Sequence, residues 1–462
     1  MTRLSQSVER AIRLLNEADL SDDTIVLQLL TETCDRRALD LSDLAPEAQA
    51  ELIRERSKEL QPSAEALVSR INEARDEGRP FVAKFGIDPT GAEVHLGHAV
   101  PMMILSRFQR MGHQVVFIVG DMTAKIGDPS GRSDERPELT DEMIAANLVT
   151  YREQVTPFFD FSRAQFRHNG DWLRKVTLAE IIELTAKIPV AMPLQREDFR
   201  KRLDSGQGLS LAELMYSVVM ALDSVEINCD LEIGGIDQFL NMQMGRKVME
   251  ISGQKPELVV ATPLIEGTDG TGAKMSKSKG NYVPLTATAE EIFGKIMSIP
   301  DHLVEPYFRS LSEWSDRELT IVADRLAAGT LHPMDLKKVL AGEVAAAIHG
   351  GDAAMKARAE FVARFSKRTF AEVDELPVVS DASRSVLDVV RGLGFAKSNS
   401  DVRRVAEQKG LRLVIEDANE QRQTVLTSYD IHDPLAVVIG RSAESSEDLY
   451  LKVGRKLARI TL

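Results

Sequence analysis

The chain has 462 residues and a formal net charge of −14, with 43% hydrophobic and 28% charged residues. This composition excludes general disorder, and the length exceeds what one compact core accommodates, so roughly two to four domains are expected. The acidic balance excludes a protein that coats nucleic acid by bulk attraction, although a local basic patch is compatible with RNA binding. The two cysteines, Cys34 and Cys229, have no metal-type spacing and favour a reduced, cytoplasmic setting. No apolar run approaches the ~20 residues that span a bilayer, so no membrane partner is expected.

Residues 1–60 are predicted to form a helical extension that packs on the body or on a partner subunit. The segment SVERAIRLLNEA has apolar residues at helical spacing, and Ser21-Asp22-Asp23 is suited to cap a second helix. A further helix over 63–78 leads to Gly78. Nothing in this part of the sequence indicates chemistry.

The stretch from Phe81 to His98 predicts a strand, a turn at Asp88-Pro89 and the start of a long helix. A second apolar run, Val115–Val119, follows that helix. Strand, helix and strand in this order form a βαβ unit, which predicts a parallel sheet with a binding crevice at the carboxyl ends of its strands. The helix start is also where backbone amides favour an anion such as phosphate.

Three more loops follow predicted strands. A Gly, Pro and Asp-rich segment follows Gly120, a Gly-Gly-Ile-Asp-Gln turn follows the strand near Cys229–Ile233, and the loop GTDGTGAKMSKSKGN follows Leu258–Ile265. Residues 140–225 between them are predicted to be mostly helical. In a parallel sheet all these loops converge on one edge, so the sequence predicts a site there.

The carboxyl-terminal third is predicted to hold two further parts. Residues 286–378 have a helical pattern throughout, and 375–383 is typical of a linker. Residues 384–462 are expected to form a small α/β unit with two helices and with strands at LRLVI, QTVLT, LAVVIG and LYLKVG.

Two short motifs indicate nucleotide chemistry. His95-Leu96-Gly97-His98 opens the long helix, and Lys274-Met275-Ser276-Lys277-Ser278 lies in the glycine-rich loop. Alone, the first is a weak signal and the second is compatible with a solvated basic loop. Both follow predicted strands, and together they supply donors for a phosphate that gains negative charge.

These motifs resemble the two signatures of class I aminoacyl-tRNA synthetases. GIDPTGAEVHLGH, GDMTAKIGDPSGR, YSVVMALDSV and GGIDQ resemble the bacterial tyrosyl type in particular, and KSNSDVRRVAEQKG is similar to the S4 RNA-binding domain of those enzymes. The resemblance covers about residues 60–462. It implies a Rossmann-type catalytic domain with a helical insertion over 61–285, an all-α anticodon-side domain over 286–378 and an S4-like α+β domain over 384–462. A homodimer is also implied, although the apolar helix after His98 equally suits an ordinary core face.

The resemblance implies attack of an amino-acid carboxylate on the α-phosphorus of ATP, with no covalent nucleophile from the protein. The groups expected to act in catalysis are His95, His98, Lys274, Lys277 and Thr90. The ATP or adenylate is expected to bind at Gly86, Asp88, Gly97, Gly234, Asp237, Gln238, Met275 and Ser276. Mg²⁺ is expected with the nucleotide, where it neutralises the phosphates, although no carboxylate cluster indicates a dedicated metal site. Arg132 and Arg136 match basic positions of a mobile loop on the phosphate side.

The amino-acid pocket departs from the family pattern at two positions. The family places Asp128 and Tyr216 near the substrate amine and Asp223 near the phenol hydroxyl, and the latter two lie on one helical face. Met220 stands where the family has a glutamine, and Lys84 where many members have a tyrosine. A thioether cannot accept from an ammonium as an amide does.

The basic residues of the last unit are predicted to contact tRNA phosphates, with a solvated helix face as the alternative. They are Lys397, Arg403, Arg404, Lys409 and Arg412. The resemblance thus implies activation of tyrosine as its adenylate and transfer to the 3′ end of tRNA. The alternatives are a paralogue for a modified tyrosine or related aromatic amino acid, a tryptophan-specific relative, and an inactive RNA-binding paralogue.

Overall fold

The computed structural model describes residues 2–17, 20, 22–130, 139–206, 208–365, 376–416, 421–441, 448–454 and 456–461. It contains two compact units, Met1–Met355 and Lys356–Leu462. No helix in the described ranges is long and apolar enough to cross a membrane.

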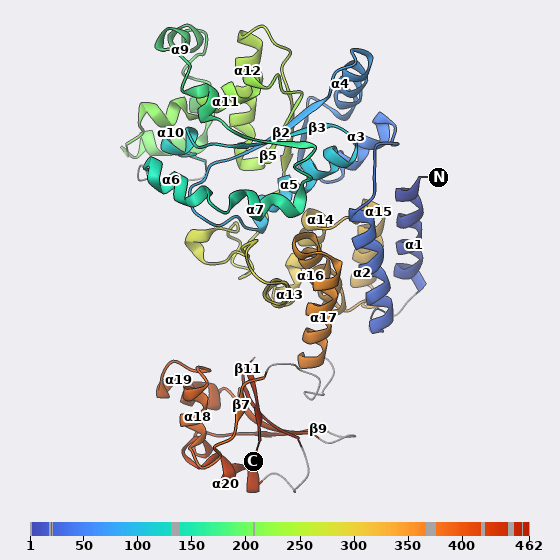
Figure 1. The fold of residues 1–462 in the computed structure, drawn as a ribbon, viewed down its shortest axis with the longest axis vertical. Helices are drawn as coiled ribbons and strands as arrows, with labels where there is room; N and C mark the ends of the chain where they lie inside the picture. The colour runs from blue at the N-terminus through green and yellow to red at the C-terminus, as the bar shows by residue number, and fades with distance from the viewer. Residues whose placement is uncertain are drawn as a thin grey trace. The chain divides into compact units, whose positions relative to one another are not determined.

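A six-stranded sheet forms the centre of the first unit (Figure 1). Its strands, in spatial order, are β1 (Glu59–Gln61), β6 (Leu258–Thr262), β5 (Leu231–Gly235), β2 (Val82–Ile87), β3 (Gln114–Val119) and β4 (Ala164–His168). All pairs except β1–β6 are parallel. The predicted parallel sheet is therefore confirmed, and the carboxyl ends of β2, β3, β5 and β6 share one edge.

Helix α5 (Leu96–Arg110) connects β2 to β3 and packs on both strands. Its residues Ala99–Leu105 are all buried, so its apolar surface is a core face rather than a free interface. In Figure 1 α5, α11 (Leu211–Glu226) and α12 (Phe239–Ile251) lie around the strands, as does α4 (Ala64–Asp76).

The segment between β3 and α11 is mostly helical, as predicted. Its helices are α6 (Asp141–Leu148), α7 (Tyr151–Val155), α8 (Gly170–Leu173), α9 (Leu178–Thr185) and α10 (Glu197–Asp204). Strand β4 was not predicted within it. The strand is short, lies at the sheet edge and is only partly buried, so its apolar pattern is weak.

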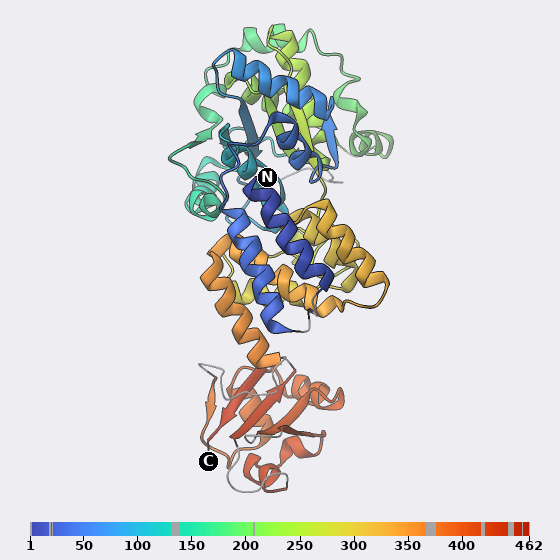
Figure 2. The ribbon, with the colours of Figure 1, turned by 90° about the vertical axis from the view of Figure 1, so that its right-hand side faces the viewer.

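The amino-terminal helices α1 (Arg3–Glu17) and α2 (Asp23–Arg37) lie side by side and pack on α15 (Asp316–Ala327) and α16 (Pro333–His349) (Figures 1 and 2). A buried ion pair joins α2 to α15, since Arg36 Nη2 lies 2.8 Å from Glu318 Oε1. Helix α3 (Pro46–Arg54) follows. The predicted helical extension is too long at its end, because residues 59–60 belong to β1, which pairs with β6.

Residues 289–365 are helical as predicted. Besides α15 and α16 they form α13 (Ala289–Met297), α14 (Val304–Leu311) and α17 (Gly351–Phe365). A Cβ on Gly342 would lie 2.5 Å from Leu30 Cδ2, so this glycine lets α2 approach α16 closely.

Beyond α17, most of which belongs to it, the described residues of the second unit form a five-stranded sheet and three α-helices. The strands, in spatial order, are β7 (Val378–Val379), β11 (Lys456–Ile460), β10 (Asp448–Val453), β8 (Leu411–Glu416) and β9 (Gln421–Val425). The helices are α18 (Val386–Gly392), α19 (Asn399–Glu407) and α20 (Leu435–Gly440).

Three predictions for this unit need correction. LAVVIG is the helix α20 and not a strand, because Leu435, Val438 and Ile439 face the core at helical spacing after Pro434. Part of the predicted linker is β7, which pairs with β11. Strand β11 itself was not predicted.

Candidate active site

The two histidines of the HLGH motif form the start of α5 at the carboxyl edge of the sheet. His95 is the N-cap, and its Nδ1 accepts from the Gly97 amide at 3.1 Å. The His98 Nδ1 in turn accepts from the His95 amide at 3.3 Å, and the two ring centroids are 3.9 Å apart. Because each Nδ1 accepts, each neutral ring carries its proton on Nε2 and can donate there.

Burial keeps both rings uncharged. It lowers the pKa of His95 to about 4, with smaller contributions from Lys277 and Lys274. Burial also lowers the pKa of His98 well below its ordinary value, with His95 adding to the effect. The helix start therefore offers neutral hydrogen-bond donors near pH 7.

The KMSKS loop lies against the HLGH motif, although nearly two hundred residues separate them in sequence. The Leu96 amide donates to the Val283 carbonyl at 3.0 Å, just beyond the loop. A Cβ on Gly97 would lie 3.9 Å from Met275 Cβ. The two motifs that were predicted to act together are therefore neighbours.

The two lysines of this loop have different surroundings. Lys274 Nζ lies 2.8 Å from Asp237 Oδ2. Lys277 Nζ lies 3.0 Å from the position of a Cβ on Gly91, and burial lowers the pKa of this lysine against an opposing effect of Glu93. Gly270, Gly272 and Gly280 around the motif have positive φ, which side chains disfavour.

Asp88, directly after β2, is in contact with Tyr216 on α11. The Tyr216 hydroxyl donates to Asp88 Oδ2 at 2.9 Å, and the Thr123 hydroxyl donates to Oδ1 at 2.7 Å. A Cβ on Gly120 would collide with the same carboxylate, so this glycine makes room for it. Thr90 is exposed at the turn, and Gly86 is also exposed at the end of β2.

A chain of polar groups crosses the edge from Asp128 to α12. Gln238 Nε2 donates to Asp128 Oδ2 at 2.7 Å, and Asn241 Nδ2 donates to Gln238 Oε1 at 2.8 Å. The buried Arg196 donates to the Asn241 side chain at 3.1 Å and to Ser130 Oγ at 3.0 Å. Gly234 precedes the turn that holds Gln238, and a Cβ on Gly234 would lie 3.1 Å from Met242 Sδ.

Asp223 is buried on α11 and lies on the same face of this helix as Tyr216. Trp172 Nε1 donates to its Oδ1 at 2.9 Å, and Asn169 Nδ2 donates to its Oδ2 at 3.3 Å. Burial raises the pKa of Asp223 to about 7, while Lys84 and these two donors oppose the rise.

Sequence reasoning missed Asn169, Trp172, Arg196, Gly120 and Thr123. Asn169 and Trp172 flank a Gly-Asp turn, where the helix α8 begins after β4. Since β4 was not predicted, its carboxyl end was not recognised as part of the same edge.

Lys84 and Met220, the two departures from the family pattern, differ in their burial. Lys84 is 1% exposed, and its Nζ lies 2.8 Å from Glu232 Oε1, so its ammonium group is buried in an ion pair. Met220 is partly buried on α11. Arg132 and Arg136 lie outside the described residues.

Comparisons with known proteins show the family of this chain. The family model described as tRNA synthetases class I (W and Y) matches residues 76–366. A tyrosine-tRNA ligase of Thermotoga maritima is 40% identical over 383 residues, which are 83% of this chain and 94% of the relative. One of Aquifex aeolicus is 37% identical over 398 residues, 86% of this chain and 98% of the relative. The chain belongs to the class I tRNA synthetases of the W and Y type.

Solved structures show the same fold for this synthetase. A truncated mitochondrial tyrosyl-tRNA synthetase of Aspergillus nidulans covers 68% of the chain with a TM-score of 0.57 and 23% identity. The enzyme of Archaeoglobus fulgidus complexed with L-tyrosine covers 68% with a TM-score of 0.54 and 21% identity. The Rossmann-type fold predicted from the resemblance is confirmed.

The predicted tRNA-contacting residues of the synthetase lie on the second unit. Lys397, Arg403, Arg404 and Lys409 are exposed on or beside α19. Arg412 on β8 is the register partner of Lys452 on β10. Burial, with Arg412 adding to it, lowers the pKa of Lys452, as expected where cations gather.

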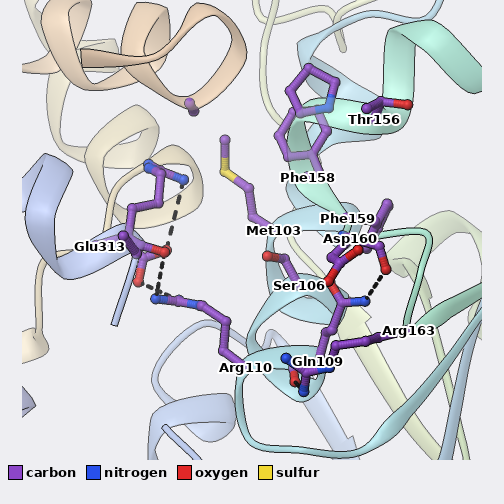
Figure 3. Close-up of a pocket in the computed structure, with 14 residues that line it drawn as sticks. Met103, Ser106, Gln109, Arg110, Thr156, Phe158, Phe159, Asp160, Arg163 and Glu313 are labelled. Carbon is purple, nitrogen blue, oxygen red and sulfur yellow. Dashed lines mark hydrogen bonds and ion pairs between the residues drawn. The ribbon is translucent and has the colours of Figure 1, made fainter. Parts of the chain in front are cut away.

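A cavity of about 410 Å³ lies elsewhere in the synthetase (Figure 3). Met103, Ser106, Gln109 and Arg110 of α5 line it, and Arg110 pairs with Glu313, another lining residue, at 2.9 Å. The rise of a helix is about 1.5 Å per residue, so Arg110 lies roughly 18 Å along the axis from His98. This cavity is therefore separate from the edge that carries the two motifs.

Within the described ranges no group of three or more His, Cys, Asp or Glu is arranged to hold a metal ion. The donors at the edge suit a nucleotide instead. Neutral imidazoles at a helix start and two lysines on a glycine-rich loop match the phosphates of ATP.

Proposed function

We propose that this synthetase is a tyrosine-tRNA ligase, which converts tyrosine and ATP to tyrosyl-adenylate and pyrophosphate and then transfers tyrosine to the 3′ end of its tRNA. The observation that carries the proposal is the contact between the HLGH and KMSKS motifs at the carboxyl edge of the sheet. The names of the bacterial relatives support it.

In the first step a carboxylate oxygen of tyrosine attacks the α-phosphorus, and the bond to the bridging oxygen of pyrophosphate breaks. The negative charge grows on the phosphate oxygens, where His95 and His98 donate from Nε2. Lys274, Lys277 and Thr90 bind the leaving pyrophosphate side, and Mg²⁺ accompanies the nucleotide. Since the protein forms no covalent bond, its contribution is orientation and electrostatic stabilisation.

The adenylate lies across the edge of the sheet. Its binding residues are Gly86, Asp88, Gly97, Gly234, Asp237, Gln238, Met275 and Ser276. The ion pair between Asp237 and Lys274 shows that the two groups reach the same region, so nucleotide binding at Asp237 competes with Lys274.

The amino acid occupies the crevice between β2 and α11. Asp128 and Tyr216 contact its ammonium group, and the carboxylate of Asp88 beside Tyr216 compensates for the missing acceptor at Met220. Asp223 accepts from the phenol hydroxyl. A ligand without that hydroxyl leaves the buried carboxylate without one partner, which is unfavourable.

Transfer requires tRNA, whose phosphates are bound by the basic residues of the second unit. Changing Arg403 and Arg404 to glutamate is expected to raise the KM for tRNA and to leave tRNA-independent pyrophosphate exchange intact. Loss of exchange in this variant would contradict the assignment.

The synthetase is proposed to act as a cytoplasmic homodimer. The helical insertion exposes large apolar side chains, with Val149 at 77%, Leu178 at 76% and Val190 at 64%. Exposed apolar side chains indicate a protein interface where they form one contiguous patch. Sedimentation of the enzyme as a monomer at micromolar concentration would contradict the dimer.

A second candidate is activation of a modified tyrosine or related aromatic amino acid, which Met220 favours. Pyrophosphate exchange with tyrosine, ring-substituted tyrosines, phenylalanine and tryptophan distinguishes the candidates. Tyrosine is expected to give the highest kcat/KM. No exchange with tyrosine but exchange with a relative would establish the second candidate, and no exchange at all would indicate an inactive paralogue.

A further inference from the structure

A buried arginine of the helical insertion begins the chain of polar groups that ends at Asp128. Arg196 lies between the short helix η3 (Pro193–Gln195) and α10, and it is 7% exposed. Its Nε and Nη2 donate to the two carboxylate oxygens of Asp198 at 3.2 and 2.8 Å. Its Cζ lies 4.7 Å from the ring centroid of Phe199. The first turn of α10 therefore holds the guanidinium group in one orientation.

The remaining nitrogen of Arg196 reaches the carboxyl edge of the sheet. Nη1 donates to Ser130 Oγ at 3.0 Å and to Asn241 Oδ1 at 3.1 Å. Ser130 belongs to the loop after β3, and Asn241 belongs to α12, directly after the Gly-Gly-Ile-Asp-Gln turn. These two side chains are exposed by 6% and 1%. One guanidinium group thus connects two of the loops that form the site.

The hydrogen bonds of this chain run in one direction, because its first group can only donate and its last group can only accept. Arg196 has no acceptor, so Asn241 turns its oxygen toward it and donates from Nδ2 to Gln238 Oε1 at 2.8 Å. Gln238 then donates from Nε2 to Asp128 Oδ2 at 2.7 Å. Reversal of either amide would bring two acceptors together and two donors together. Arg196 thereby sets the orientation of both amides.

Asp128 is fixed at both of its oxygens and can still accept from a cation. Its Oδ1 accepts from the Ser130 amide at 2.9 Å, and its Oδ2 accepts from Gln238. A carboxylate oxygen accepts in about two directions, so within the described residues each oxygen retains one. Asp128 is half-buried, whereas Arg196 has almost no exposed surface. A substrate ammonium group can therefore reach Asp128 but not the arginine behind it.

We propose that Arg196 is a positioning residue for recognition of the amino group of the substrate. It acts through Ser130 and Asn241, which hold Asp128 and Gln238 in the orientation that accepts an ammonium group, and it does not touch the substrate. The proposal rests on the proposed function, in which Asp128 contacts the amine, and deepens it. It also gives the helical insertion a role in the site, because the insertion supplies this arginine.

The test removes the guanidinium group together with its counter-ion, in the variant Arg196→Met/Asp198→Asn, so that neither charge is left unpaired. Two inhibitors of pyrophosphate exchange with tyrosine give the measurement. Tyramine has the ring and the ammonium group, and 3-(4-hydroxyphenyl)propanoate has the ring and the carboxylate. The inhibition constant of tyramine and the KM for tyrosine are expected to rise by about tenfold, because a charged group loses a well-placed hydrogen bond. The inhibition constant of the propanoate, kcat at saturating tyrosine and KM for ATP are expected to change little.

A uniform effect on the two inhibitors would contradict the proposal. If both weaken by the same factor, or neither weakens, Arg196 serves only the folding of the insertion. Arg36→Met/Glu318→Gln is the matched control, because it removes another buried pair in which one guanidinium group donates to both oxygens of a carboxylate. This control is expected to leave both inhibition constants unchanged.

A second variant decides the question if Arg196→Met/Asp198→Asn does not fold. Asn241→Asp keeps the shape of the side chain and an oxygen that faces Arg196, but it cannot donate to Gln238. Gln238 is then expected to turn its nitrogen toward the introduced carboxylate and its oxygen toward Asp128. Tyramine should weaken by about tenfold relative to the propanoate. An unchanged ratio of the two inhibition constants would overturn the proposal.

The two proposals fail in different ways. A wild-type enzyme that exchanges with tyrosine, together with an Arg196→Met/Asp198→Asn variant in which the two inhibition constants keep their ratio, overturns the role of Arg196 alone. A folded wild-type enzyme that gives no exchange with tyrosine overturns the proposed function and this inference with it.

Discussion

The phosphate end and the ring end of the crevice use buried ionisable groups in opposite ways. At the phosphate end burial lowers the pKa of His95 and His98, so both rings are neutral donors. At the ring end burial raises the pKa of Asp223 to about 7, and Lys84 opposes that rise. Burial disfavours the charged form in both places. The difference is that a neutral imidazole is already a donor to a phosphate, whereas a carboxyl accepts from a hydroxyl more strongly when it is ionised.

The largest effect is expected from removing a donor at the phosphate end. His98→Ala should lower kcat for pyrophosphate exchange by about 100- to 1000-fold, because one transition-state hydrogen bond is lost, and KM for ATP should change little. Steady-state exchange kinetics measure both. A rise in KM alone would show that His98 serves ground-state binding instead.

His332→Ala is a control for the loss of helix stability that a histidine substitution at the start of α5 causes. His332 caps α16 by accepting from the Met334 amide at 3.1 Å, as His95 caps α5. Loss of that cap should cost about 1 kcal/mol of stability without lowering kcat.

A smaller effect is expected from the loop. Lys277→Ala should lower kcat by about 10- to 100-fold, since hydrogen bonds to charged groups are worth about 1.5–3 kcal/mol. Lys279→Ala, an exposed neighbour in the same turn, should stay near wild type. Equal losses in both variants would indicate a general effect of loop charge rather than a specific contact.

The smallest effect is a difference between two pH profiles. The pKa of His95 is lowered to about 4 and that of His98 well below its ordinary value, so kcat at saturating tyrosine should not follow a histidine titration between pH 6 and 8. Asp223 is ionised only above its pKa of about 7, so kcat/KM for tyrosine should fall several-fold from pH 8 to pH 6. Identical pH profiles of kcat and of kcat/KM for tyrosine would contradict the difference between the histidines and Asp223.

The same pKa values affect stability with opposite signs. His95 binds a proton more weakly in the folded state, so its contribution is present above pH 6.5 and is lost as the pH falls toward 4. Asp223 binds a proton more tightly in the folded state, so its contribution is present at low pH and is lost as the pH rises through about 7. Urea unfolding of His95→Gln and Asp223→Asn across this range would separate the two.

Much of the phosphate end was predictable from local sequence. HLGH begins a helix after a strand, and the glycines around KMSKS permit the turns that expose it. The ring end was less predictable. Trp172 and Asn169 follow β4, a short edge strand with a weak pattern, and Lys84 was placed from the resemblance as a residue of the pocket.

The sequence by itself predicted the two motifs at strand ends and a parallel sheet, because turn chemistry and hydrophobic period are local properties. It could not distinguish α20 from a strand, since a short apolar run suits both until the core face is known. Only the tertiary structure decided that Lys84 pairs with Glu232, 148 residues away, and that Glu257 faces the same carboxylate. The charge of a buried group depends on every neighbour that folding brings to it, and these neighbours come from several distant segments of the sequence.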